Sequence, residues 1–201
     1  MANTKYFKKP LVEAVTVIGW EGYGAKRRED EMTISNSITK GLNYAKKEFG
    51  INFNFHEVWS SDRDCIEQVL RIISNTRTDD GLLMIQKSYA GPRSWKLLKK
   101  HHTLLSIFPK VVMIWIDPHG RLWFDGSMKP FGKRRMFIIP DNWIHDNMEL
   151  FGAYQHRKWP HGGIPVAKGI QVINIPDTDH KHIVNHPKTL QMIVQGIHCF
   201  V

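Results

Sequence analysis

The stretch 81–86 (GLLMIQ) most constrains what this chain can fold into, because it is apolar until its last residue. A short, continuous apolar run of this kind is typical of a strand that is covered on both faces, as in the middle of a parallel sheet. Parallel strands are joined by crossover connections, which are usually helices. The stretch therefore predicts an α/β fold built around this strand.

Segments with strand and helix patterns alternate along the rest of the chain. Further strands are expected at 14–19, 52–59, 111–117, 136–140 and 171–175. Helices are expected where apolar residues recur at helical spacing, at 31–49, 63–75, 92–108 and 188–196. This alternation predicts a three-layer α/β fold with a mostly parallel, twisted sheet of about six strands and helices on both faces. No internal repeat or linker divides the chain, so residues 1–201 are expected to form one domain.

The composition is that of a globular protein, with 42% hydrophobic and 23% charged residues. No apolar run approaches the roughly 18–20 residues that cross a bilayer. The polar, basic start of the chain has no secretory signal pattern, so a cytoplasmic location is expected. The two cysteines, Cys65 and Cys199, offer no disulfide framework and are expected to be free thiols.

The formal net charge is +9, with a sequence pI near 9.6. This balance favours anionic partners such as nucleic acid, an acidic lipid surface or an acidic substrate. The basic residues are spread over several clusters, one of which lies in the helix expected at 92–108. Ordinary solvated surface is the favoured interpretation of each cluster, so the charge alone does not define a function.

Residues 82–91 (LLMIQKSYAG) place a serine at the end of the central strand, just before a helix. A nucleophile on a tight strand-to-helix turn needs small neighbours, and Ala90 and Gly91 are small. The turn also aims main-chain N–H groups of the helix start at the space beside the Ser88 hydroxyl. On its own, a serine at such a position is more often a plain helix cap, so a nucleophilic Ser88 depends on further features of the sequence.

This segment resembles the nucleophile elbow of the α/β-hydrolase superfamily, which reads small-x-Ser-x-small. Gln86 stands where the family usually has glycine. By pattern and order the resemblance extends over 12–196, and it is closest to small lidless lipases and cutinase-like esterases. It implies a Ser-His-Asp triad that hydrolyses carboxylic esters through an acyl-enzyme, with no metal and no other cofactor.

The resemblance also implies an oxyanion hole. The family forms part of this site in a glycine-bearing turn after its first core strand, which here is VIGWEG. The main-chain N–H groups of Trp20 and Tyr89 match these positions. Tyr23 and Trp143 are candidates for apolar walls that bind the substrate, and core packing is the alternative for each.

The histidine of the triad is expected after the last strand, in PDTDHKHIVNH, where His180 matches the family position. His182 and His186 are second choices. An alternative interpretation of this segment is a divalent metal site, and its candidate ligands are Asp177, Asp179, His180, His182 and His186.

The acid is expected at Asp117, within WIDPHG, where some lipase-like relatives place it. Asp146 and Asp141 are the alternatives, because the more usual family position follows the next strand. Tyr154 and Gln155 lie in a segment that resembles a Tyr-Gln segment of bacterial lipase-like hydrolases, where they would support the histidine loop.

The favoured function is therefore hydrolysis of a small-molecule or lipid ester. One rival is a non-catalytic α/β domain that binds nucleic acid or another polyanion through the basic helix around 96–102. The other is a metal-dependent hydrolase built on the C-terminal histidines. The oligomeric state is not predicted.

Overall fold

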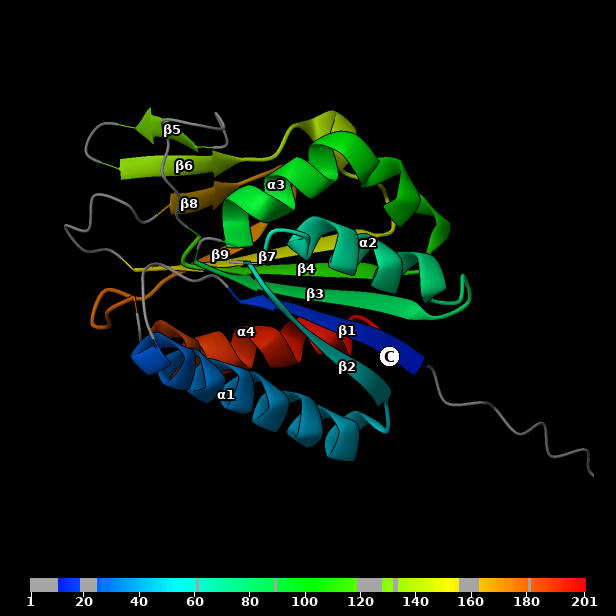
Figure 1. The fold of residues 1–201 in the computed structure, drawn as a ribbon, viewed down its shortest axis with the longest axis horizontal. Helices are drawn as coiled ribbons and strands as arrows, with labels where there is room; N and C mark the ends of the chain where they lie inside the picture. Colours follow the sequence, from blue (N-terminus) through cyan, green and yellow to red (C-terminus); the bar gives the residue numbers. More distant parts are fainter. Residues whose placement is uncertain are drawn as a thin grey trace, which may run out of the picture.

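A computed structural model describes the chain over residues 11–18, 25–60, 62–88, 90–118, 128–131, 134–155, 163–180 and 182–201. Its centre is a six-stranded sheet with the order β2-β1-β3-β4-β7-β9, in which every neighbouring pair is parallel (Figure 1). The strands are β1 (Leu11–Ile18), β2 (Asn52–Trp59), β3 (Gly81–Lys87), β4 (Val111–Ile116), β7 (Met148–Tyr154) and β9 (Gln171–Asn174). The expected parallel sheet is confirmed.

Helices cover both faces of this sheet, with α2 and α3 on one side and α1 and α4 on the other (Figure 1). The α-helices are α1 (Ala25–Phe49), α2 (Cys65–Asn75), α3 (Ala90–His101) and α4 (Pro187–His198). The short 3-10 helices are η1 (His102–Ile107), η2 (Asp141–Trp143) and η3 (Ile183–Asn185). The three-layer architecture expected from the alternation is therefore also confirmed.

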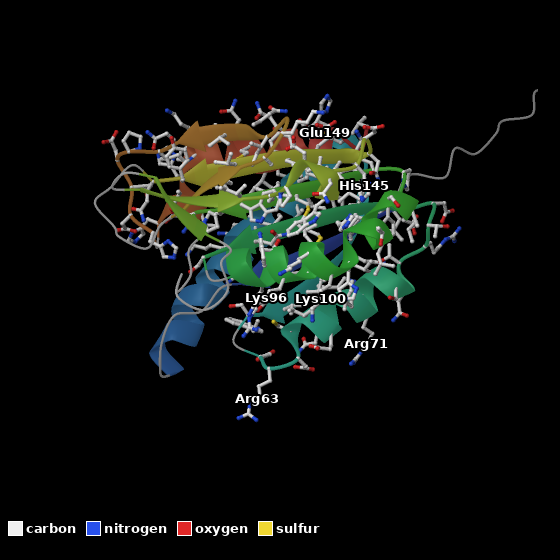
Figure 2. All side chains as sticks on the ribbon, turned by 90° about the horizontal axis from the view of Figure 1, so that it is seen from above. Arg63, Arg71, Lys96, Lys100, His145 and Glu149 are labelled. Carbon is white, nitrogen blue, oxygen red and sulfur yellow. The ribbon has the colours of Figure 1, made fainter. Side chains whose placement is uncertain are left out.

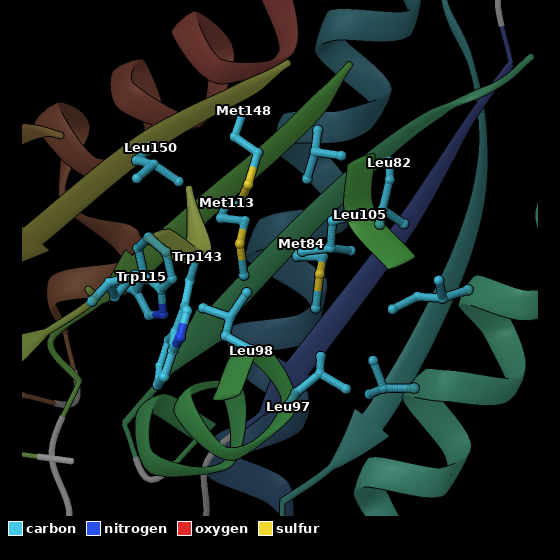
Figure 3. Packing of buried hydrophobic residues seen from close by; sticks show 14 of the residues in the cluster. Leu82, Met84, Leu97, Leu98, Leu105, Met113, Trp115, Trp143, Met148 and Leu150 are labelled. Carbon is cyan, nitrogen blue, oxygen red and sulfur yellow. The ribbon is translucent and has the colours of Figure 1, made fainter. Parts of the chain in front are cut away.

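The two central strands explain why both faces need cover. Every residue of β3 and β4 is buried. Successive side chains of a strand point to opposite faces. Met84 accordingly packs in the cluster under α2 and α3, shown in Figure 3, while Leu83 packs in the cluster under α1 and α4.

The strand expected at 136–140 lies outside the main sheet, so this expectation is wrong in topology. The segment forms β6 (Arg134–Ile138) of a three-stranded sheet, between β5 (Met128–Phe131) and β8 (Gly163–Val166). β6 pairs antiparallel with β5 and parallel with β8.

The fifth strand of the main sheet is instead β7, which the sequence patterns did not indicate. Its sequence MELFGAY carries a charged residue and a glycine inside the apolar run. Both fit the structure. Glu149 pairs with Lys110 at 3.2 Å, and Gly152 leaves room for the ring of Pro165, with which any Cβ would collide.

The helix expected at 92–108 divides into α3 and the 3-10 helix η1. The break is at His101, whose φ of −136° is not helical. Asn147 then donates side-chain hydrogen bonds to the carbonyls of Leu105 (2.9 Å) and Phe108 (2.7 Å). These bonds satisfy carbonyl groups at the end of this segment, where a helix leaves its last four carbonyls without an internal partner.

The neighbouring strands β1 and β3 lead into helices on opposite faces of the sheet, since β1 is followed by α1 and β3 by α3. Open α/β sheets bind ligands at such a switch point, beyond the carboxyl ends of the strands. Ser88 follows β3 directly and so lies at this edge. Within the described residues, no helix is long and apolar enough to cross a membrane.

Candidate active site

Ser88 occupies a sharp turn between β3 and α3. Its φ of +59° is in the left-handed region, where a residue with a side chain costs roughly 1–2 kcal/mol. The Ser88 N–H donates to the carbonyl of Ile116 (3.1 Å), and the Gly91 N–H donates to the Ser88 carbonyl (3.1 Å). These two bonds tie the turn to β4 and to the first turn of α3. The turn thus holds a strained serine, only 3% exposed, at the carboxyl edge of the sheet.

Asp117 occupies the corresponding place after β4. Its φ is +43°, and Ser88 and Asp117 are the only residues other than glycine with positive φ in the described part of the chain. The Asp117 N–H donates to the carbonyl of Ala153 in β7 (2.7 Å). The side chain is 1% exposed. Strained residues of this kind cluster at functional sites, so the two turns direct attention to the same edge.

His180 joins these two side chains. It lies in the loop after β9, and its Nε2 is 2.9 Å from Ser88 Oγ while its Nδ1 is 2.5 Å from Asp117 Oδ2. A carboxylate only accepts hydrogen bonds, so Nδ1 carries a proton and Nε2 is free to accept from the Ser88 hydroxyl. Such an arrangement can withdraw the hydroxyl proton while the oxygen attacks an electrophile.

Gln155, which the sequence placed as a support of the histidine loop, contacts the Asp117 carboxylate that bonds to His180. Its Nε2 donates to Asp117 Oδ2 (2.8 Å), and its main-chain N–H donates to Oδ1 (3.4 Å). Gln155 follows β7 directly and is itself 9% exposed. One residue therefore contacts both oxygens of the buried carboxylate.

The alternative acids lie elsewhere. Asp141 begins η2 and Asp146 follows it, so both precede β7 and belong to the amino end of that strand. Both are exposed, whereas the hydrogen bond to His180 comes from Asp117. The structure thus brings together Ser88, His180 and Asp117, and leaves the two alternatives apart from them.

Of the residues expected to form the oxyanion hole and the walls of the substrate site, only Trp143 lies within the described residues. Trp143 is 9% exposed and packs among the core residues shown in Figure 3, so it follows the core-packing alternative. Its ring lies 5.3 Å from that of Trp95. Trp20, Tyr23 and Tyr89 lie outside the described residues.

The other C-terminal histidines have structural partners. The His182 N–H donates to Asp179, and its ring Nδ1 lies 2.8 Å from both oxygens of the same carboxylate. His186 Nδ1 accepts from the Lys188 N–H and caps α4. The described residues contain no group of three or more histidine, cysteine or acidic side chains arranged to hold a metal ion.

Neither cysteine is prepared to act as a nucleophile. Burial raises the pKa of the Cys65 thiol, with Arg93 opposing the shift. Burial also raises the pKa of Cys199, and the charge of Glu149 adds to the effect. Both thiols are free, and raised pKa values keep them protonated near neutral pH. Ser88 is thus the better candidate nucleophile.

Gln86, at the position where the elbow motif usually has glycine, is completely buried in β3. Neither of its amide atoms has a hydrogen-bond partner among the described residues. A buried, unpaired amide costs about 1–3 kcal/mol. The departure from the motif is therefore an energetic burden on the strand, but the turn after it still forms.

Comparisons with known proteins bear on the fold. No protein-family model matches the sequence, and no curated protein matches it either. Among solved structures, the chain is similar to Est1E from Butyrivibrio proteoclasticus, with 11% identity and a TM-score of 0.50. The match covers 94% of this chain and 86% of Est1E. At this identity the likeness concerns the fold alone, and the chain has the α/β-hydrolase fold.

Proposed function

We propose that this protein is a serine hydrolase that cleaves carboxylic esters. Ser88 is the nucleophile, His180 is the general base, and the Asp117 carboxylate orients His180. The observation that carries the proposal is the unbroken hydrogen-bond chain from Ser88 Oγ through the His180 ring to Asp117 Oδ2. These groups stand at the carboxyl edge of a sheet with the α/β-hydrolase fold, two of them on strained turns. Ordinary helix capping by Ser88 would need neither the histidine nor the carboxylate.

In the proposed reaction, Ser88 Oγ attacks the ester carbonyl carbon while His180 Nε2 takes the hydroxyl proton. The resulting imidazolium is stabilised by the buried Asp117 carboxylate, which also fixes the ring orientation. The same proton passes from Nε2 to the departing alkoxide, leaving an acyl-enzyme. Water, deprotonated by His180, then releases the acid and restores Ser88.

Charge that develops on the carbonyl oxygen needs hydrogen-bond donors. We assign this role to the main-chain N–H groups of Trp20 and Tyr89, each of which is typically worth about 3 kcal/mol in such a site. The first turn of α3, which begins at Ala90, adds the positive end of a helix dipole beside Ser88. The choice of esters over amides rests on the resemblance to small lidless lipases and cutinase-like esterases.

The proposal is tested by covalent labelling with a fluorophosphonate probe, which reacts with an activated serine. We expect one label per chain, unaffected by chelator, and none in Ser88→Ala or His180→Ala. Ser106→Ala is the matched control, since Ser106 is an exposed serine whose hydroxyl donates to the Thr103 carbonyl. Turnover of p-nitrophenyl esters should be lost in the same two variants. Well-folded wild-type protein that takes up no label would contradict the proposal.

The surface of α3 favours one alternative function, the binding of a polyanion such as nucleic acid. The helix AGPRSWKLLKKH contains no acidic residue, and Lys96 and Lys100 lie along it, as Figure 2 shows. Lys99 and Lys100 are exposed. This alternative predicts binding that weakens steeply with salt and with Lys96→Glu/Lys100→Glu, and that is unchanged in Ser88→Ala. The serine hydrolase proposal predicts full ester turnover in that double lysine variant.

A further inference from the structure

The Asp117 carboxylate is buried at 1% exposure, and it receives hydrogen bonds from two residues. Oδ2 accepts from both His180 Nδ1 (2.5 Å) and Gln155 Nε2 (2.8 Å), while Oδ1 accepts from the Gln155 main chain (3.4 Å). Burying a charge without such donors is strongly unfavourable. Among the described residues, Gln155 is therefore the one that satisfies this carboxylate together with the histidine.

Parallel strand pairing accounts for the position of Gln155. In the register of β4 with β7, Ile116 is paired with Ala153, and the Asp117 N–H then bonds to the Ala153 carbonyl. Gln155 emerges two residues later, beside the turn at Asp117. Because both strands end together, the contact follows from the sheet itself.

The chemistry of the side chain is specific. A carboxylate can only accept, so the atom of Gln155 that faces Oδ2 is the amide nitrogen. Glutamate at this position would bring a second negative charge to the same oxygen. A methionine would have similar length but no donor. Of these three side chains, only the amide of glutamine both donates a hydrogen bond to the carboxylate and adds no charge to it.

We propose that Gln155 is a positioning residue, which acts through Asp117 and does not touch the substrate. Its two donors clamp the carboxylate so that Oδ2 stays in line with His180 Nδ1, and its side chain keeps the charge of Asp117 stabilised away from water. The proposal rests on the proposed serine hydrolase function. It assigns to Gln155 the orientation of the acid, which in turn orients the base.

The test compares Gln155→Met with Gln155→Asn and with a matched control, Gln171→Met, which changes an exposed glutamine of β9. Turnover of a p-nitrophenyl ester is measured per active site, with the sites counted by fluorophosphonate labelling. We expect kcat to fall roughly 10–100-fold in Gln155→Met, the effect of losing a hydrogen bond to a charged group. KM should change less than about threefold, and Gln155→Asn should recover part of kcat through its shorter amide.

A second readout does not depend on turnover. The proton between His180 Nδ1 and Asp117 gives a strongly low-field NMR signal, identified by its absence in His180→Ala. We expect Gln155→Met to shift or lose this signal and Gln171→Met to leave it in place. An unchanged signal together with an unchanged kcat per labelled site would overturn the proposal and leave Gln155 a packing residue. If the wild-type protein takes up no label and hydrolyses no ester, the serine hydrolase function is rejected instead. The low-field NMR signal would then still show whether Gln155 holds the Asp117 carboxylate in place.

Discussion

The interior of β3 and β4 and the single residue that follows each strand obey opposite rules. Inside the strands the side chains are apolar almost throughout, fully buried and held in an ordinary extended backbone. One step beyond, Ser88 and Asp117 are polar, nearly as buried, and in the left-handed region. The apolar strand interiors contribute stability. The edge of the sheet instead places two strained polar residues close enough to bond to the same histidine ring.

This difference indicates that burial of apolar side chains in the core offsets the free-energy cost of the strained residues Ser88 and Asp117 at the edge of the sheet. The two clusters on either side of the sheet take apolar side chains from all four α-helices. Each fully buried aliphatic side chain contributes about 1.5–3 kcal/mol. Against this, two left-handed residues cost roughly 1–2 kcal/mol each. The fold can therefore hold both strained turns, and substitutions in the two regions should have opposite effects on activity and stability.

The largest expected effect is on activity at the edge. Asp117→Asn should keep the shape of the side chain but favour the wrong tautomer of His180, and lower kcat by about 10³–10⁴-fold. The measurement is steady-state ester hydrolysis, with urea unfolding to show that the variant is folded. Asp141→Asn and Asp146→Asn are the matched controls and should retain wild-type kcat. Loss of activity in Asp146→Asn with an active Asp117→Asn would reassign the acid.

The next effect should appear in stability alone. Ile114, in the middle of β4, is completely buried against α4, where it lies close to Gly196. Ile114→Ala should lower the free energy of unfolding by about 2–5 kcal/mol through lost burial and a residual cavity. Urea unfolding measures this change, and kcat per labelled site should stay within about twofold of wild type.

The control for this substitution is Val172→Ala, because Val172 is 37% exposed on β9. Its effect on unfolding should be well under half that of Ile114→Ala. A large drop in kcat per labelled site for Ile114→Ala would mean that core packing also determines activity, so that stability and activity do not depend on separate regions.

Much of the fold could be predicted because the interior follows simple rules. The strand at 52–59 coincides with β2, and 81–86 differs from β3 by one residue. β7 was missed because Glu149 and Gly152 interrupt its apolar pattern. Their partners, Lys110 and Pro165, are distant in sequence, so no local pattern indicates that these residues suit a strand.

The contacts at the carboxyl edge of the sheet were harder to predict from sequence patterns, again because the partners are distant in sequence. Ser88, His180 and Asp117 could each be proposed from their place relative to a strand end, and the structure brings the three side chains together. The contact of Gln155 with Asp117 depends on the register of β4 with β7, a strand that the patterns did not reveal. Sequence patterns thus predict which polar residue follows a strand, but not which residue of a neighbouring strand contacts it.

The smallest effect should be a gain in stability at the edge. Ser88→Gly removes the side chain that makes a φ of +59° unfavourable, so the turn is relieved of its strain. Glycine also loses more backbone freedom on folding, which offsets part of the gain. The net expectation is about 1 kcal/mol of added stability in urea unfolding, with no fluorophosphonate label. Ser88→Ala is the matched control, because it also removes the hydroxyl but keeps the strained Cβ. Equal unfolding free energies for Ser88→Gly and Ser88→Ala would show that the turn stores no strain, and the contrast between a relaxed interior and a strained edge would then rest on burial and polarity alone.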